Sequence, residues 1–270
     1  MFSLALDDEQ SQIRDMVDDF VRSEVCPARR QPSCQDQFEF VIPDAIMASA
    51  SGLGLRYLSL SEARGGPGLP QLTFSVVAET LAFGDAGLAA TFCSTAALAT
   101  ALFDKLLHAG GFEDVANDFV GDDLFPLSLV DGRKAKPVVI SKYLSDEALD
   151  YSVTASREGG AWHLSGTVQS AINAPIAKLL IVIAQDRESG RPQVFLVQAG
   201  TDGLEIVERC KEEATSNDFS SSTMSWRHGA HGKVTFADCV IDNSAWVEAG
   251  DIDAFFDYLG KAGTLRVRTY

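Results

Sequence analysis

The feature that most constrains the fold is a change in the spacing of apolar residues near the middle of the 270-residue chain. Up to about residue 122, apolar residues recur every three or four positions, which is typical of helices that pack on one side. From about 124 to 245 they alternate with polar residues or form short runs between glycines, which is typical of strands. We therefore predict an α+β fold in which a helical part precedes a small antiparallel β-barrel or sandwich.

Four helices are expected in the first part. The first has an apolar stripe at i, i+3, i+4, i+7 and i+8, formed by Ile13, Met16, Val17, Phe20 and Val21. Pro27 is predicted to end this helix after Cys26. The others are expected at 44–51, at 72–83 and at about 88–108, with Asp85 as the N-cap of the last. The glycine-rich stretch 64–68 is expected to be a turn.

Six or seven strands are expected in the second part. The continuous apolar run 178–184 predicts a strand at the centre of the sheet. Two alternating segments flank Glu158-Gly159-Gly160, and this pattern predicts a hairpin. The remaining strands are expected at 138–141, 193–197, 204–207 and 234–240. Helical spacing returns after Trp246.

Composition excludes several classes of protein. A hydrophobic content of 46% excludes a disordered chain, and a net charge of −16 argues against nucleic-acid binding. The five cysteines form no metal-like pair, so we expect reduced thiols and a cytoplasmic location. The N-terminus lacks the pattern of a signal peptide. The longest apolar run, 179–184, is too short to span a bilayer, so no membrane association is expected.

Six segments, in order, resemble the acyl-CoA dehydrogenase family. Residues 8–27 are similar to the first helix of that family, and 60–69 (LSEARGGPGL) to its "PEEYGGxGL" loop. Residues 79–89 are similar to its "EELAR-DASLA" helix pair. In the second part, the matching segments are 162–167 (WHLSGT), 173–178 (NAPIAK), and 203–204 with 234–236. The chain is thereby identified as a member of the acyl-CoA dehydrogenase family over about residues 6–245.

The resemblance implies a division into domains and a chemistry. The expected domains are a helical N-terminal domain (1–122), a β-barrel middle domain (123–245) and the first helix of an incomplete C-terminal domain (246–270). In the family, FAD lies between the domains and accepts the β-hydrogen of an acyl-CoA substrate as hydride, while a glutamate removes the α-proton. That glutamate usually lies in the C-terminal helical bundle. No glutamate of this sequence matches it, so no catalytic residue is assigned.

The candidate cofactor-binding residues are Leu127, Ser128, Ser170 and Ile172. Residues 126–135 (PLSLVDGRKA) stand where the family reads "ALTEPxAGSD", so Ser128 and the backbone of Leu127 are the groups that would reach the flavin. Residues 170–174 (SAINA) stand where the family reads "WITNG". Ser170 therefore replaces an aromatic ring, and Ile172 replaces a hydroxyl donor. Loss of one stacking ring removes about 1–3 kcal/mol, so FAD is expected to be weakly held or shared with a partner chain.

Other candidate residues point to ordinary structural roles. Glu248 is interpreted as a solvated loop carboxylate. His228 and His231 are three residues apart but have no third ligand of metal type nearby, so no metal site is predicted. Arg227 or Lys233 would be able to contact a CoA phosphate if the cleft of the family is present. The glycine-rich stretch 64–68 lacks the Lys-Ser/Thr of a phosphate loop.

Three functions remain open from the sequence. The first is a subunit of a heteromeric, FAD-dependent acyl-CoA dehydrogenase in lipid metabolism, with an acyl-CoA dehydrogenase-like partner subunit that supplies flavin contacts and the glutamate. The second is a noncatalytic binding or scaffold module. The third is a truncated, inactive dehydrogenase. Under all three, the chain alone is expected to be inactive.

Overall fold

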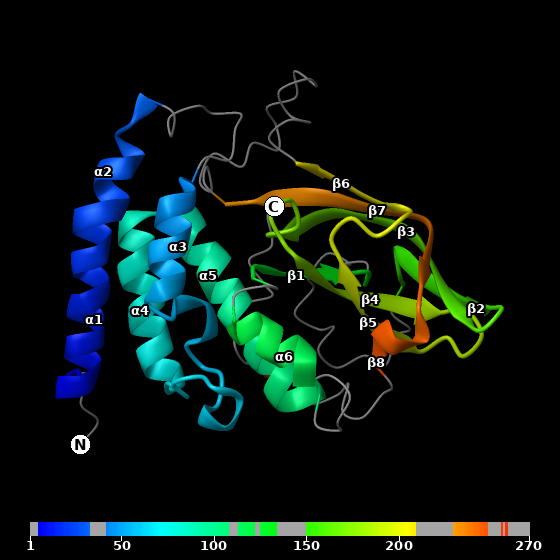
Figure 1. The fold of residues 1–270 in the computed structure, drawn as a ribbon, viewed down its shortest axis with the longest axis horizontal. Coiled ribbons are helices and arrows are strands. Elements are labelled where there is room, and N and C mark those ends of the chain that lie inside the picture. Colours follow the sequence, from blue (N-terminus) through cyan, green and yellow to red (C-terminus); the bar gives the residue numbers. More distant parts are fainter. Residues whose placement is uncertain are drawn as a thin grey trace, which may run out of the picture.

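The structure is a computed structural model. It describes residues 5–32, 42–107, 113–121, 125–133, 150–208, 229–247, 255, 257 and 258. The helices are α1 (Asp8–Phe20), η1 (Val21–Val25), α2 (Cys26–Arg29), α3 (Asp44–Gly52), η3 (Leu55–Tyr57), η4 (Glu62–Arg64), α4 (Gln71–Gly84), α5 (Ala86–Ala99), η5 (Thr100–Leu106), α6 (Glu113–Val120) and η9 (Asn243–Ala245). The strands are β1 (Leu127–Asp131), β2 (Val153–Glu158), β3 (Ala161–Ile172), β4 (Leu179–Asp186), β5 (Pro192–Gln198), β6 (Leu204–Glu208), β7 (His231–Ile241) and β8 (Trp246–Val247). Helices gather on one side of the molecule and strands on the other (Figure 1).

The first helix does not end at Cys26, so that expectation was wrong. After α1 the backbone continues as the π-helical segment η1 and then as α2, with Pro27 in the first turn of α2. A proline ring and its missing N–H disrupt the regular i→i−4 hydrogen bonds of a helix, and the π-helical segment directly before Pro27 is a local distortion of this kind. The start of α1 is fixed by Asp7, whose side chain accepts from Gln10 N while the Gln10 side chain accepts from Asp7 N.

The other expected helices are confirmed, with small changes at their ends. Asp85 is the N-cap of α5, and its side chain accepts from Leu88 N at 2.9 Å. The helix then continues beyond α5 as the π-helical segment η5. The short helix α6 had no counterpart among the expected elements. The expected strand 138–141 lies outside the described residues.

The continuous helix Ala86–Leu106 is long and apolar enough, by length and composition, to cross a membrane. Its apolar sequence is less continuous than the run 179–184, because small and polar residues interrupt it. However, 83% of its most apolar window is buried inside the structure. Burial of that extent is typical of the central helix of a helical core, and α5 has this role here.

The expected closed, antiparallel barrel is corrected to an open and mostly antiparallel sheet. Its order is β6-β7-β3-β2-β4-β5-β8, and β1 pairs with β4 in parallel. The end of β4 also pairs in parallel with β2. Among the described strands, the outermost are β6, which pairs with β7, and the two-residue β8, which pairs with β5. The sheet therefore stays open between β6 and β8.

The central strand β4 buries both of its faces. Leu179, Ile181 and Ile183 belong to a core that the helices share with the sheet. Leu180, Val182 and Ala184 belong to a second core that lies among the strands. Because alternate side chains of a strand point to opposite faces, a continuous apolar run is required wherever both faces are covered. The expectation that 178–184 is central is confirmed, with β4 bonded to β1, β2 and β5.

The expected hairpin is confirmed between β2 and β3. Glu158 pairs with Ala161, so Gly159 and Gly160 form a two-residue loop. Both glycines have positive φ, 59° and 88°, which the tight turns of right-twisted strands require.

Candidate functional site

The four candidate cofactor-binding residues come from two strands. Leu127 and Ser128 begin β1, and Ser170 and Ile172 lie at the end of β3. Three of the four are joined directly, because Ser128 Oγ donates a hydrogen bond to the carbonyl oxygen of Ile172 at 2.7 Å. The structure therefore brings Leu127, Ser128 and Ile172 together, at the junction of the sheet with α5.

The accessibility of these residues differs sharply. Leu127 and Ser128 are both 0% exposed. Ser170 and Ile172 are half-buried. The hydroxyl of Ser170 lies 3.5 Å from Nδ1 of His231, which is itself buried. Only Ser170 and Ile172 are thus positioned to touch a bound molecule.

Asn173 completes the junction and was not predicted as a site residue. Its side-chain Nδ2 lies 3.0 Å from the carbonyl oxygen of Thr91, 3.2 Å from Thr95 Oγ1 and 3.2 Å from the carbonyl oxygen of Leu127. Its φ is +66°, a conformation that asparagine adopts more readily than most residues. The signal in the sequence was an asparagine directly after a strand, but its partners are 46 to 82 residues away.

These residues do not fit a tightly held flavin. Such a ring needs accessible polar groups at its edge and an apolar or aromatic surface against its face. Ser128 directs its hydroxyl to Ile172, and the carbonyl oxygen of Leu127 accepts from Asn173. The accessible pair, Ser170 and Ile172, offers one small hydroxyl and one aliphatic side chain. Among these four residues, the site therefore has no aromatic surface, and its accessible polar edge is reduced to the Ser170 hydroxyl.

The far end of β1 carries a charged pair. Arg133 Nη2 lies 2.6 Å from Asp131 Oδ2. The backbone of Arg133 also pairs with that of Tyr151 as an isolated antiparallel β-bridge. Burial lowers the pKa of Arg133, but the hydrogen bonds to Asp131 and the negative charge of Asp131 together outweigh burial, and the net pKa is raised. Burial raises the pKa of Tyr151 as well. Because the guanidinium of Arg133 is bonded to the carboxylate of Asp131, we interpret this ion pair as structural.

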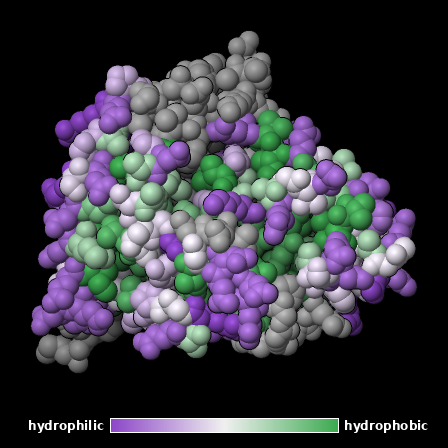
Figure 2. All heavy atoms as spheres, viewed as in Figure 1, coloured by the Kyte–Doolittle hydropathy of each residue, from purple (hydrophilic) through white to green (hydrophobic). Residues whose placement is uncertain are grey.

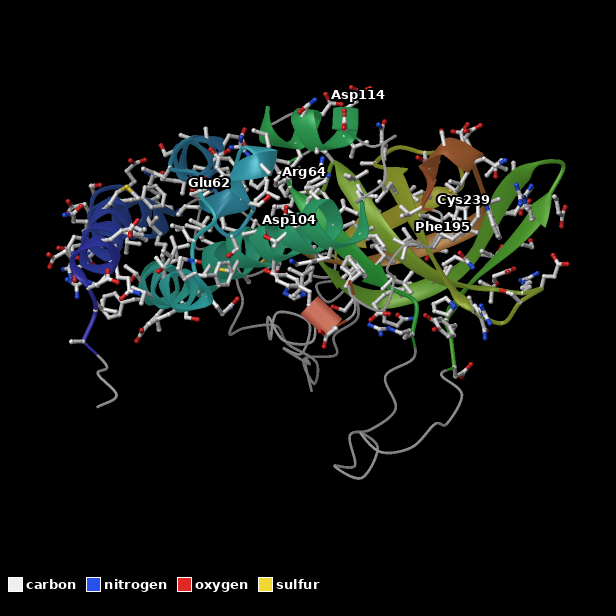
Figure 3. All side chains as sticks on the ribbon, turned by 90° about the horizontal axis from the view of Figure 1, so that it is seen from below. Glu62, Arg64, Asp104, Asp114, Phe195 and Cys239 are labelled. Atoms are coloured by element: carbon white, nitrogen blue, oxygen red, sulfur yellow. The ribbon has the colours of Figure 1, made fainter. Side chains whose placement is uncertain are left out.

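The glycine-rich stretch is held as a structural turn, as expected. A Cβ on Gly66 would lie 2.2 Å from the carbonyl oxygen of Leu60, so only glycine fits. Ser61 before it is bound through N and Oγ to Asp104, at 3.0 and 2.7 Å. Arg64 donates to the carbonyl oxygen of Leu107 at 3.1 Å. Figure 3 shows Glu62, Arg64 and Asp104 on the helical part, and Phe195 and Cys239 within the strands.

The remaining candidates are settled only in part. Arg227, His228 and Glu248 lie outside the described residues, whereas Lys233 lies in β7 opposite Val207. In the described part of the chain, no three His, Cys, Asp or Glu side chains are grouped so as to hold a metal ion. Cys93 and Cys239 are buried free thiols, and burial raises their pKa to about 12 and about 11. Neither is a thiolate nucleophile at neutral pH.

Three comparisons place this geometry among known proteins. Residues 7–114 match the family model of the acyl-CoA dehydrogenase N-terminal domain. No curated protein matches the chain. Among solved structures, a glutaryl-CoA dehydrogenase from Mycobacterium smegmatis in complex with FADH2 is 18% identical, with a TM-score of 0.72 over 95% of this chain and 60% of that one.

Two further solved structures are similar to the same extent. Butyryl-CoA dehydrogenase from Megasphaera elsdenii is 18% identical, with a TM-score of 0.70 over 97% of this chain and 64% of that one. The prolyl acyl carrier protein oxidase AnaB is 19% identical, with a TM-score of 0.70 over 94% of this chain and 62% of that one. The chain thus spans less than two thirds of the length of these structures. The resemblance is confirmed: residues 7–114 match the acyl-CoA dehydrogenase N-terminal domain, and the chain shares its fold with solved acyl-CoA dehydrogenases.

Proposed function

We propose that the chain is one subunit of a heteromeric acyl-CoA dehydrogenase, which removes hydrogens from the α and β carbons of an acyl-CoA thioester with FAD as acceptor. Within it, this chain supplies one side of the flavin site, the candidate wall, which consists of Leu127, Ser128, Ser170 and Ile172. An acyl-CoA dehydrogenase-like partner subunit supplies most of the flavin contacts and the glutamate that takes the α-proton.

The observation that carries the proposal is the hydrogen bond from Ser128 Oγ to the carbonyl oxygen of Ile172 at 2.7 Å, with Ser128 fully buried. A hydroxyl committed in this way contributes nothing to a cofactor. Opening it would leave the Ile172 carbonyl without that donor, at a cost of about 1–3 kcal/mol. Because the Ser128 hydroxyl is bonded within the chain, the polar contacts to the flavin must come from another chain.

The surface is consistent with a further protein chain against the helices. Among the described residues, the large apolar side chains that are most exposed are Leu72, at 60%, and Phe83, at 78%. They are eleven residues apart on α4, which is about three helical turns, so they share one side of the helix. The Ala-rich helix α5, by contrast, is largely buried. Figure 2 shows apolar residues in separate groups among polar ones on the face in view.

The experiment is a visible absorption spectrum and an FAD titration of the purified chain, alone and co-purified with a candidate partner. We expect a colourless chain alone, with no dehydrogenation of acyl-CoA by an artificial electron acceptor. Flavin is expected only with the partner, at fewer than one per chain of the family. Stoichiometric flavin on the chain alone overturns the proposal. A colourless, inactive complex with every family partner supports a noncatalytic scaffold instead.

A gain-of-function variant sharpens the experiment. Ser170→Trp combined with Ile172→Thr restores the aromatic ring and the hydroxyl that the family has at these positions. One stacking ring is worth about 1–3 kcal/mol, so FAD affinity is expected to rise by roughly ten- to a hundredfold. Val240→Trp is the matched control, because it adds the same ring at an exposed position of β7. Equal FAD affinity in both variants would contradict the assignment of the wall.

A further inference from the structure

Asn173 is the residue that joins the helical part to the sheet. Its single side chain is within hydrogen-bond distance of two residues of α5, Thr91 and Thr95, and of Leu127 in β1. Its backbone N–H donates to the carbonyl oxygen of Ala230, just before β7, at 2.6 Å. Asn173, which is fully buried, therefore bonds to α5, to β1 and to the residue directly before β7, which are distant from one another in the sequence.

The same junction contains two polar atoms without a partner. Among the described residues, Asn173 Oδ1 and Thr91 Oγ1 are buried and have no hydrogen-bond partner. They belong to residues that are already in contact, because Asn173 Nδ2 lies 3.0 Å from the Thr91 carbonyl oxygen. Both residues are 0% exposed, so bulk water cannot reach them.

Two buried polar atoms without a hydrogen-bond partner are energetically unfavourable. Each costs about 1–3 kcal/mol when it loses its hydrogen bonds to water and gains none in the protein. Native proteins avoid this cost by enclosing an ordered water that binds two to four polar groups. Asn173 Oδ1 can only accept, whereas the Thr91 hydroxyl can donate or accept. A water molecule has the donors and acceptors to serve both.

We propose that Asn173 and Thr91 form a binding site for an enclosed water molecule, and that this hydrated junction locks α5 against β1. The site holds the carbonyl of Leu127 through Asn173, and Ile172 is the neighbour of Asn173 in the chain. It thereby acts as a positioning element for the candidate wall, whether or not a flavin binds there.

Thr91→Val is the sharpest variant, because valine keeps the shape of threonine and removes only the hydroxyl. If Thr91 Oγ1 binds no water, the Thr91→Val variant should have unchanged or higher stability. If it holds a water, the variant loses that water, and amide exchange in α5 and β1 becomes faster. We expect a several-fold to tenfold increase in α5 and β1, with little change in β6 and β7, which a general loss of stability would not spare.

Asn173→Gly keeps the positive φ and removes the whole amide, and we expect it to accelerate the same amides by more than tenfold. Asp238→Gly is the matched control, because Asp238 also has positive φ, 52°, but is exposed and bonded to His163. Its effect is expected to stay near His163. If Asn173→Gly does not fold, Thr91→Val still decides the matter.

A high-resolution crystal structure of the chain provides the direct measurement. We expect a water peak within hydrogen-bond distance of Asn173 Oδ1 and Thr91 Oγ1, and its absence in Thr91→Val. Unchanged or slower exchange in Thr91→Val, or a wild-type junction without a water peak, overturns the proposal.

Discussion

The two faces of β4 belong to different cores, and their partners differ in kind. One face, with Leu179, Ile181 and Ile183, packs into a core that extends through α1, α4 and α5. The opposite face packs against other strands, including Phe195 of β5 and Phe236 of β7. The helices and the sheet therefore share one continuous core through this face of β4, although their sequence patterns change abruptly near residue 123. The division into domains at that point stays a prediction.

The largest expected effect comes from Phe92→Ala in the shared core. Phe92 is fully buried, and its ring centroid lies 5.4 Å from that of Phe125. Loss of a buried phenylalanine destabilises a protein by about 3–5 kcal/mol. Chemical denaturation followed by circular dichroism should show helices and sheet unfolding together. Phe83→Ser, at a 78% exposed position, should change stability by less than about 0.5 kcal/mol. Separate unfolding of the helices would show that the two parts of the chain do not depend on one shared core.

A smaller effect is expected from Gly166→Ala on β3. The φ of Gly166 is +136°, and an added Cβ would lie 2.0 Å from the carbonyl oxygen of Ser152. Overpacking of this kind costs about 1–3 kcal/mol, to which the backbone conformation adds strain. Gly160→Ala, with φ +88° and nothing within 4 Å, isolates the strain alone, about 1–2 kcal/mol. Equal urea midpoints for Gly166→Ala and Gly160→Ala would show that β2 and β3 move apart and relieve the steric overlap.

Each core contains one buried thiol that can report its opening. Cys93 belongs to the shared core and Cys239 to the core among the strands. Burial raises the pKa of Cys93 to about 12 and that of Cys239 to about 11. Both should therefore resist iodoacetamide up to about pH 9 in the native protein, as followed by peptide mass spectrometry. Half-buried Cys26 should react before Cys93 and Cys239. Rapid native labelling of Cys239 alone would indicate that the core among the strands opens independently.

The smallest effect is expected at the turn after β4. Burial acts to raise the pKa of Asp186, but hydrogen bonds from Ser189 and Glu188 outweigh it, and the net pKa is lowered. Since the folded pKa lies below the unfolded one, the contribution to stability is present above about pH 4 and is lost as the pH falls through the folded value. Asp186→Asn should cost less than about 1 kcal/mol at neutral pH. Its stability should also decline less between pH 5 and 3, which urea denaturation at each pH would measure.

Much of the fold was predictable because local patterns carry it. The apolar stripe of α1, the N-cap Asp85 and the two glycines after Glu158 each determine their own structure over a few residues. Pro27 misled because a proline inside a helical pattern is compatible with a first turn as well as with an end. The barrel was wrong because alternation along a strand reports which faces are covered and not whether the two outer strands meet.

The candidate wall was predictable only as a set of positions. Leu127, Ser128 and Ile172 do lie together, but their burial and the hydrogen bond between Ser128 and Ile172 depend on a contact across 44 residues. Asn173 was missed for the same reason, because its three acceptors come from α5 and β1.

The order of helices and strands and the central strand follow from the sequence, because periodicity and turn chemistry act over a few residues at a time. The family resemblance also follows from the sequence, because it rests on six short segments. Only the tertiary structure decided that β4 has two different cores, that the sheet stays open, and that Asn173 joins helix to sheet. These features depend on which distant side chains share a buried volume, and that is a property of the packed chain.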